Sequence, residues 1–264
     1  MPTAADTSPT PTGTLVAWGG GGDNELLSWL GERFGGTGVE VVVAATPVRP
    51  LVTGRAYVAA LRRRGFSSVS IVHPTSRTPM DARAYLKRLE TARLVFFTGG
   101  DQECLTEALG GSRYLEMLRE RYRTDGLVVA GTSAGAAALA DQMIVGGHGW
   151  RSLMSGRVRV APGLGLVEGA FFDSHFSERN RFGRLAHAVL RDPDRLGVGI
   201  GEETGVVCRP ESPGCFEVLG EGVVTVVDGR DSRAPGLKEL PYGHPISGRD
   251  LKLHLLTAGD RFGF

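Results

Sequence analysis

The stretch GTSAG at residues 131–135 decides the fold of this chain. The apolar run GLVVA (126–130) leads into it, and the small residues AAALA (136–140) lead out of it. This order predicts a buried strand, a sharp turn and a helix, because glycines permit a turn that a side chain would block. Ser133 is then expected at the tip of the strand, beside the free N–H groups of a helix N-terminus. A serine in that position is a candidate nucleophile for acyl transfer, and an ordinary glycine-rich turn is the alternative.

Strand-like runs alternate with amphipathic segments on both sides of this stretch. Apolar runs at 15–18, 39–45, 69–72 and 94–97 indicate strands, and the run at 39–45 is of the kind expected in a strand buried on both faces. Repeated strand–helix units predict an α/β fold with a doubly wound, mostly parallel sheet sandwiched by helices. Short apolar runs after residue 206 predict antiparallel additions to that sheet near the C-terminus. Ligands in such folds bind at the carboxyl ends of the strands, where the serine is expected.

The same pass along the chain predicts its organisation. Residues 1–13 begin with a Thr-, Pro- and Ala-rich segment and are expected to form a disordered tail before a single domain at 14–264. Helix starts are predicted from capping residues and apolar spacing. Helices are expected to start at about Asp23, Thr53 and Thr78. One long helix is expected after Asp101, ending near Arg123. A further helix is expected to start near Ser177, with a buried apolar stripe that begins at Phe182.

The composition excludes several classes of function. Lys and Arg total 30 against 29 Asp and Glu, so no basic bias indicates binding of nucleic acid or a membrane surface. No apolar run approaches the roughly 20 residues of a membrane span, and residues 1–11 lack the layout of a signal peptide. Cys104, Cys208 and Cys215 are scattered and resemble neither a disulfide framework nor a zinc site. We therefore expect a cytoplasmic protein without a metal or other cofactor.

A serine nucleophile needs a base, and the base needs an orienting acid. His175 stands out among six histidines, because residues 171–172 indicate a short buried strand that presents it. A satisfied buried histidine is the alternative. Glu202 and Glu203 follow an apolar run, so one carboxylate is expected to face the site and the other solvent. Asp173 is the rival acid, although residues two apart on a strand point the same way without facing each other.

An oxyanion hole needs two N–H donors. The amide of Ala134, directly after the serine, is expected to supply one. The turn at 99–101 follows a neighbouring strand, and Gly100 or Asp101 is expected there to supply the other, since glycine permits close approach. A plain strand-to-helix turn is the alternative for this segment.

Four motifs in this order resemble the cyanophycinase branch of the serine peptidase family that also contains dipeptidase E. They are the segments at 98–102, 131–135, 173–185 and 199–204, and the likeness spans nearly the whole chain. The resemblance implies a class I glutamine-amidotransferase-like fold that is usually dimeric. It also implies hydrolysis of β-linked aspartyl peptides, with a peptide or cyanophycin-like substrate as the partner.

By this resemblance Ser133 is the nucleophile, His175 the base and Glu202 the acid. The resemblance also implies a substrate pocket, lined here by Gln102, Asp173, Ser174, Arg179, Arg181 and Arg184. A solvated helix face is the alternative for the arginines.

Two positions depart from the family pattern. Ser174 stands where the family usually has a glutamine before the histidine, and Gly201 stands where an aspartate usually precedes the acid. Serine is shorter than glutamine and lacks the amide. The reactive groups are therefore kept, whereas the pocket is expected to differ.

Four other interpretations compete with this one. A relative that acts on a different peptide or amide, as a dipeptidase or a biosynthetic tailoring hydrolase, is the main alternative. A non-catalytic binding module has no chemical need for serine, histidine and glutamate together. A general α/β-hydrolase has its acid before its histidine, opposite to the order here. Cys104 as nucleophile lacks a glycine elbow around it.

Overall fold

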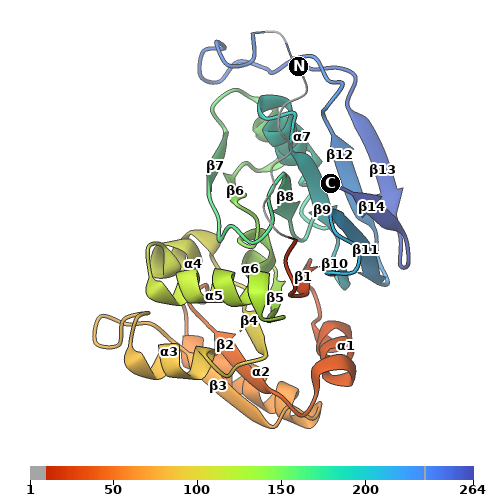
Figure 1. The fold of residues 1–264 in the computed structure, drawn as a ribbon. Coiled ribbons are helices and arrows are strands. Elements are labelled where there is room, and N and C mark those ends of the chain that lie inside the picture. Colours follow the sequence, from red (N-terminus) through yellow and green to blue (C-terminus); the bar gives the residue numbers. More distant parts are fainter. Residues whose placement is uncertain (1–9, 235) are drawn as a thin grey trace.

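The computed structural model describes residues 10–234 and 236–264, which form a mixed α/β fold (Figure 1). The elements in chain order are β1 (Leu15–Trp18), α1 (Asn24–Phe34), β2 (Gly38–Val42), α2 (Pro50–Arg63), β3 (Ser68–Val72), α3 (Arg83–Leu89), β4 (Leu94–Phe97), α4 (Gln102–Leu109), α5 (Arg113–Thr124), β5 (Val128–Thr132), α6 (Ala134–Ala137), β6 (Gln142–Gly146), the 3-10 helix η1 (Gly149–Leu153), β7 (Val158–Pro162), β8 (Ala170–Asp173), α7 (Phe182–Arg191), β9 (Leu196–Ile200), β10 (Thr204–Cys208), β11 (Cys215–Gly220), β12 (Val224–Asp228), β13 (Lys252–Leu256) and β14 (Arg261–Gly263).

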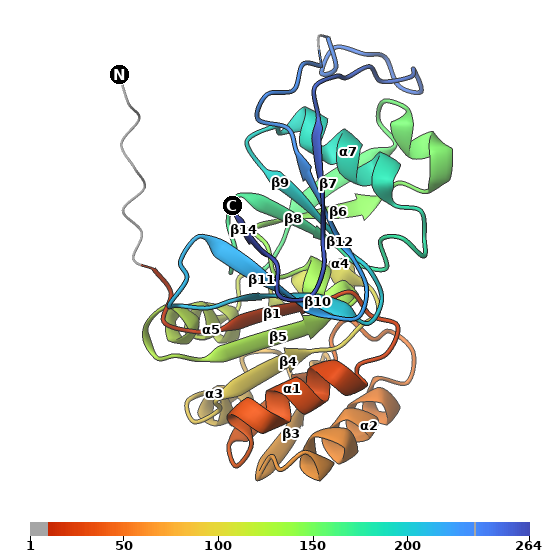
Figure 2. The same ribbon diagram turned by 90° about the vertical axis from the view of Figure 1, so that its right-hand side faces the viewer.

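The large sheet has the strand order β14-β11-β10-β1-β5-β4-β2-β3. Strands β1, β5, β4, β2 and β3 run parallel, whereas β10, β11 and β14 are antiparallel additions. Figure 2 shows α1 and α2 in front of the sheet, with α3 and α5 behind it. The prediction of a large, mostly parallel sheet flanked by helices is confirmed. The carboxyl ends of the parallel strands share one edge, which brings the segments after β1, β4 and β5 together.

A second sheet has the order β13-β12-β9-β8. Strands β12 and β13, which the sequence predicts as additions to the large sheet, belong here instead, because β12 pairs with β9 in the register Val224 to Ile200. Both residues are buried in a core that also holds side chains of the large sheet. The hairpin of β6 and β7 and the helix α7 flank this second sheet, and all three lie above the large sheet in Figure 1.

Several helix boundaries differ from the predictions. Helix α2 begins at Pro50, so Thr53 lies inside it, and α3 begins at Arg83 rather than just after Thr78. The long helix expected after Asp101 is two helices, because a glycine-containing turn and the cap of α5 at Ser112 interrupt it. The caps at Asp101 and Ser112 are local signals, whereas the N-cap residues of α2 and α3 make no side-chain cap hydrogen bond.

Helix α7 also differs from its prediction. It begins at Phe182 instead of near Ser177, because the chain first makes a turn in which His175 and Asn180 adopt positive φ angles of 45° and 48°. Phe182, expected in a buried stripe, is 46% exposed at the helix start.

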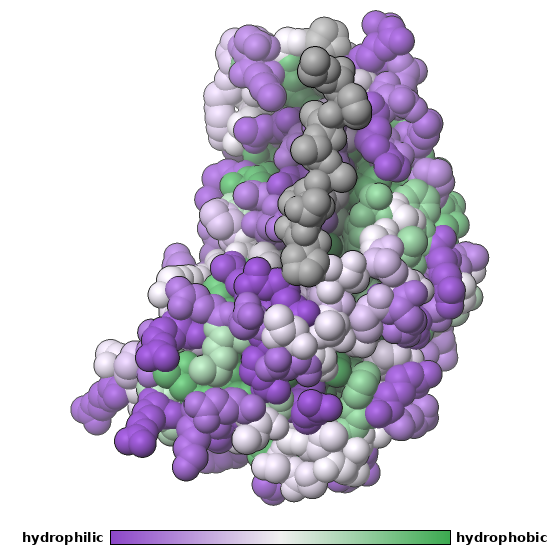
Figure 3. Space-filling view, viewed as in Figure 1, coloured by the Kyte–Doolittle hydropathy of each residue, from purple (hydrophilic) through white to green (hydrophobic). Residues whose placement is uncertain are grey.

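The predicted tail at 1–13 lies outside the described residues over positions 1–9. The N–H groups of Thr12 and Gly13 donate to the carbonyl oxygens of Arg123 (3.0 Å) and Tyr122 (2.9 Å), so ordered contacts begin before residue 14. Within the part of the chain that the structure describes, no helix has the length and apolar character needed to cross a membrane. Hydrophilic and hydrophobic residues are interspersed on the face that Figure 3 shows.

Candidate active site

Ser133 forms the sharp turn between β5 and α6. Its φ and ψ angles are 55° and −115°, a combination that non-glycine residues adopt only when their surroundings hold them there. The Ser133 N–H donates to the Trp18 carbonyl oxygen at 2.9 Å. A Cβ atom on Gly131 would lie 2.6 Å from the Gly135 backbone, and one on Gly135 would lie 2.5 Å from the Phe97 carbonyl oxygen. The two glycines are therefore required for the elbow to close against the sheet.

His175 and Glu202 form a hydrogen-bonded chain with Ser133. The Ser133 Oγ lies 2.8 Å from His175 Nε2, and His175 Nδ1 lies 2.5 Å from Glu202 Oε1. His175 is buried just after β8, and the half-buried Glu202 lies in the short link that joins β9 to β10. Glu203, its neighbour, is exposed.

This chain of atoms is suited to proton transfer. When the Nδ1–H of His175 is donated to the Glu202 carboxylate, Nε2 is left as an acceptor for the Ser133 hydroxyl proton. The carboxylate also stabilises the imidazolium that forms once the proton has moved. The arrangement can therefore activate the serine hydroxyl as a nucleophile.

A loop of four glycines at 19–22 packs against the histidine and the acid. A Cβ atom on Gly20 would lie 2.4 Å from His175 Cε1, and one on Gly21 would lie 2.6 Å from Glu202 Cβ. The Gly19 carbonyl oxygen accepts the His175 N–H at 2.9 Å. The sequence alone predicts no catalytic role for this loop, although four consecutive glycines after a strand are a signal for close backbone approach.

The segment after β4 lies on the other side of Ser133. A Cβ atom on Gly99 would stand 3.2 Å from Ser133 Cβ. The Asp101 N–H, expected as an oxyanion donor, already donates to the Ala45 carbonyl oxygen at 2.6 Å, so it has no free hydrogen for an oxyanion. For the N–H groups of Gly100 and Ala134, residues 10–234 and 236–264 supply no hydrogen-bond acceptor. These two amides are the remaining candidate donors.

Asp173 and Arg184 form a buried ion pair. The Arg184 Nε donates to Asp173 Oδ2 at 2.7 Å, its Nη2 also donates to Asp173, and its Nη1 donates to the Gly146 carbonyl oxygen at 3.0 Å. The exposed fractions are 1% for Asp173 and 3% for Arg184. Arg184 thus donates to groups within the protein, and its contact with substrate stays a prediction. Asp173 is disfavoured as the rival acid, because arginines hold its carboxylate.

Arg181 lies beside this pair and keeps one buried donor, Nε, without a partner among the described residues. Its Nη1 donates to the Ser174 carbonyl oxygen at 2.6 Å and to Asp173 at 3.2 Å. Burial, helped by repulsion from Arg184 and Arg179 and opposed by Asp173, lowers the pKa of Arg181 to about 10. The guanidinium therefore stays charged at neutral pH.

The other predicted pocket residues lie nearby in different settings. Ser174 is buried, with Oγ 3.5 Å from Arg181 Nη1. Gln102, at the start of α4, donates from Nε2 to the Ile144 carbonyl oxygen at 3.1 Å. Arg179 is exposed on the turn that follows His175.

The second family departure, Gly201, is packed beside the acid. A Cβ atom at this position would lie 3.1 Å from the Val223 carbonyl oxygen and 3.7 Å from Glu178 Oε1. A carboxylate at 201 would therefore face another carboxylate, whereas glycine avoids that repulsion.

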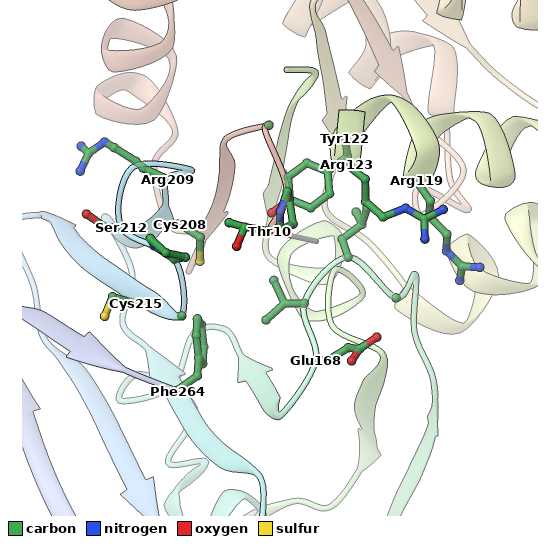
Figure 4. A pocket seen from close by; sticks show the side chains of 17 residues that line it. Thr10, Arg119, Tyr122, Arg123, Glu168, Cys208, Arg209, Ser212, Cys215 and Phe264 are labelled. Carbon is green, nitrogen blue, oxygen red and sulfur yellow. The ribbon is translucent and has the colours of Figure 1, made fainter. Parts of the chain in front are cut away.

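A cavity of about 370 Å³ lies apart from this site, at the amino ends of β1 and β5 (Figure 4). Cys208 and Cys215 line it, and burial raises the pKa of the Cys208 thiol to about 12. Cys104 lies within α4, and its pKa is also raised, by burial first and then by the Asp101 charge. Neither Cys104 nor Cys208 is thus favoured as a thiolate nucleophile at neutral pH.

Comparisons with known proteins give relatives over nearly the whole chain. Residues 54–212 match peptidase family S51. The chain is 35% identical to the cyanophycinase of Trichormus variabilis over 261 residues, which are 97% of this chain and 87% of the relative. It is 32% identical to the cyanophycinase of Geminocystis herdmanii over 239 residues, 90% of this chain and 87% of the relative.

Two solved structures share the fold. A peptidase from an acI-B1 Actinobacterium superposes with a TM-score of 0.67 at 21% identity, over 97% of this chain and 99% of that one. A putative peptidase E protein from Listeria monocytogenes EGD-e superposes with a TM-score of 0.57 at 15% identity, over 79% of this chain and 98% of that one. At these identities the likeness concerns the fold alone.

Proposed function

The chain belongs to peptidase family S51 as a cyanophycinase-like serine peptidase, and we propose that Ser133, His175 and Glu202 are its catalytic triad. The observation that carries the proposal is the unbroken hydrogen-bonded chain from Ser133 Oγ through both nitrogens of His175 to Glu202. The exposed Glu203 makes no such contact within the described residues.

The proposed reaction proceeds through an acyl-enzyme. The Ser133 Oγ attacks the scissile carbonyl carbon while His175 Nε2 takes its proton, and Glu202 stabilises the imidazolium. The N–H groups of Gly100 and Ala134 are proposed to bind the oxyanion. His175 then gives the proton to the leaving amine as the C–N bond breaks. In the second half, His175 takes a proton from a water molecule that attacks the ester carbon, and returns it to the Ser133 Oγ as the ester C–O bond breaks and the carboxylic acid leaves.

We further propose that the bond cleaved is a β-aspartyl isopeptide bond in a peptide resembling cyanophycin. Relatives named cyanophycinase at 35% and 32% identity support this substrate class. The exposed Arg179 favours recognition of a substrate carboxylate, because the guanidinium fork matches its geometry. A homodimer and a cytoplasmic location belong to the same proposal.

Ser174 favours a second candidate, a hydrolase specialised for another peptide or amide. Its short side chain lies against Arg181 in place of a glutamine amide, so cyanophycin is expected to lose hydrogen bonds there. This candidate shares the triad and differs only in the group that fills the pocket.

Labelling with a fluorophosphonate probe tests the nucleophile. The wild type should be modified at Ser133, and Ser133→Ala should neither react nor turn over any accepted substrate, since only a hydroxyl is removed. Retention of activity by Ser133→Ala would contradict the proposal. Values of kcat/KM on cyanophycin and on a panel of β-aspartyl dipeptides then separate the two candidate substrates.

A further inference from the structure

Asp23 occupies the N-cap position of α1 without capping the helix. Aspartate at this position usually accepts a hydrogen bond from the first turn, as Asp101 and Ser112 do at the starts of α4 and α5. The Asp23 carboxylate instead accepts the Thr132 hydroxyl at 2.7 Å with Oδ1 and the Tyr57 hydroxyl with Oδ2. The Asp23 side chain thus makes two hydrogen bonds to residues outside α1 and none to the first turn of that helix.

Both hydroxyls are suited to hold this carboxylate. Thr132 is the last residue of β5 and is 2% exposed, directly before Ser133. Tyr57 lies on α2, and burial together with the Asp23 charge raises its pKa, so it stays protonated as a donor. An ionised carboxylate only accepts, so neither contact depends on a choice of donor.

The same residue ends the glycine loop that packs on the base and the acid. The Gly19 carbonyl oxygen accepts the His175 N–H, and the Trp18 Nε1 donates to the Gly22 carbonyl oxygen at 2.9 Å. Asp23 follows Gly22 directly. The Asp23 carboxylate therefore connects two segments by a hydrogen bond. One is the glycine loop at 19–22, which contacts His175, and the other is the turn that carries Ser133.

We propose that Asp23 is a positioning residue that clamps Thr132 and so keeps the Ser133 Oγ within 2.8 Å of His175. The inference rests on the proposed role of Ser133 as nucleophile. The strained φ of 55° at Ser133 persists only where contacts with the surrounding structure define the backbone. The bond to Trp18 supplies one such contact, and the Thr132 clamp supplies another.

The experiment measures the second-order rate constant of fluorophosphonate labelling at Ser133. Asp23→Ala should lower this constant on the order of tenfold to a hundredfold, because a nucleophile displaced by about 1 Å loses a comparable factor. Asp23→Asn should recover much of the loss, since its amide oxygen can still accept from Thr132. Thr132→Val should match Asp23→Ala, and the double variant should be no slower than either single variant.

Ser112→Ala is the control for a general loss of stability, because it removes the cap of α5, a helix that carries none of the proposed catalytic groups. It should lose stability and keep the wild-type labelling constant. Labelling within twofold of wild type in a folded Asp23→Ala overturns the inference, as do additive losses in the double variant. If Asp23→Ala does not fold, Thr132→Val decides by the same twofold limit. A wild type that is not labelled at Ser133 refutes the proposed function itself and the inference with it.

Discussion

Replacement of Gly20 by alanine tests the geometry of the site at one atom. The new Cβ would stand 2.4 Å from His175 Cε1 and 2.6 Å from Nε2. Carbon atoms in contact are separated by about 3.5–4.0 Å, so the imidazole would have to move by roughly 1 Å. The backbone of His175 is poorly placed to follow, because its N–H is bonded to the Gly19 carbonyl oxygen at 2.9 Å.

The expected loss has two parts. Gly20 has a φ of 94°, and a side chain in such a conformation costs roughly 1–2 kcal/mol of folding free energy. Displacement of the ring breaks the 2.8 Å contact between Ser133 Oγ and His175 Nε2. A misplacement of about 1 Å costs on the order of 10²-fold in rate, and complete loss of the base costs about 10³-fold or more.

Gly65→Ala separates the two parts. Gly65 has a φ of 87°, close to that of Gly20, and a Cβ there would meet nothing within 4 Å among the described residues. Urea unfolding should show a loss of stability in both variants, the larger one in Gly20→Ala, where the Cβ also meets the imidazole. Fluorophosphonate labelling should fall only in Gly20→Ala. Labelling of Gly20→Ala within threefold of wild type, or an equal loss of rate in Gly65→Ala, would refute the argument.

Three further outcomes are expected. Glu202→Gln should lower kcat about 10³–10⁴-fold while Glu203→Gln stays within about twofold, and equal losses in the two variants would contradict the assignment. Ser174→Gln should raise kcat/KM on cyanophycin about tenfold or more, since a hydrogen bond to a charged group contributes about 1.5–3 kcal/mol. Efficient hydrolysis of cyanophycin by the wild type, with no gain in the Ser174→Gln variant, would contradict this prediction. Burial lowers the pKa of His187, so the unfolded chain binds a proton that the folded chain does not as pH falls below 6.5. Stability should then rise with pH through that range, and His187→Asn should flatten the dependence of the urea midpoint on pH.

The strands and the elbow could be predicted because their signals are local. Strands buried on both faces give continuous apolar runs, and the run at Leu94–Phe97 coincides with β4. The sharp turn at Ser133 is encoded by the consecutive residues 131–135, with glycines at the two positions where a Cβ atom would meet the backbone. A pattern of this kind needs no knowledge of distant segments.

The roles of several charged residues could not be predicted, because they depend on segments far away in the chain. The sequence does not reveal that Arg184 is buried, with its Nη1 donating to the Gly146 carbonyl oxygen at the end of β6. The start of α7 was missed because the positive φ of His175 is set by its contact with Gly19 and not by its own preference. Asp23 looks like a helix cap in the sequence, and only the fold directs its carboxylate toward Thr132.

The two sheets contribute different parts of the proposed triad. Ser133 stands on the large sheet, His175 follows a strand of the small sheet, and Glu202 lies in the three-residue passage from one sheet to the other. The catalytic activity of Ser133 therefore depends on the relative position of the two sheets. A displacement of one sheet relative to the other would separate the three residues and inactivate the enzyme, while each sheet kept its own hydrogen bonds. Inactivation would then precede the loss of secondary structure. Circular dichroism alone would still count such a molecule as native.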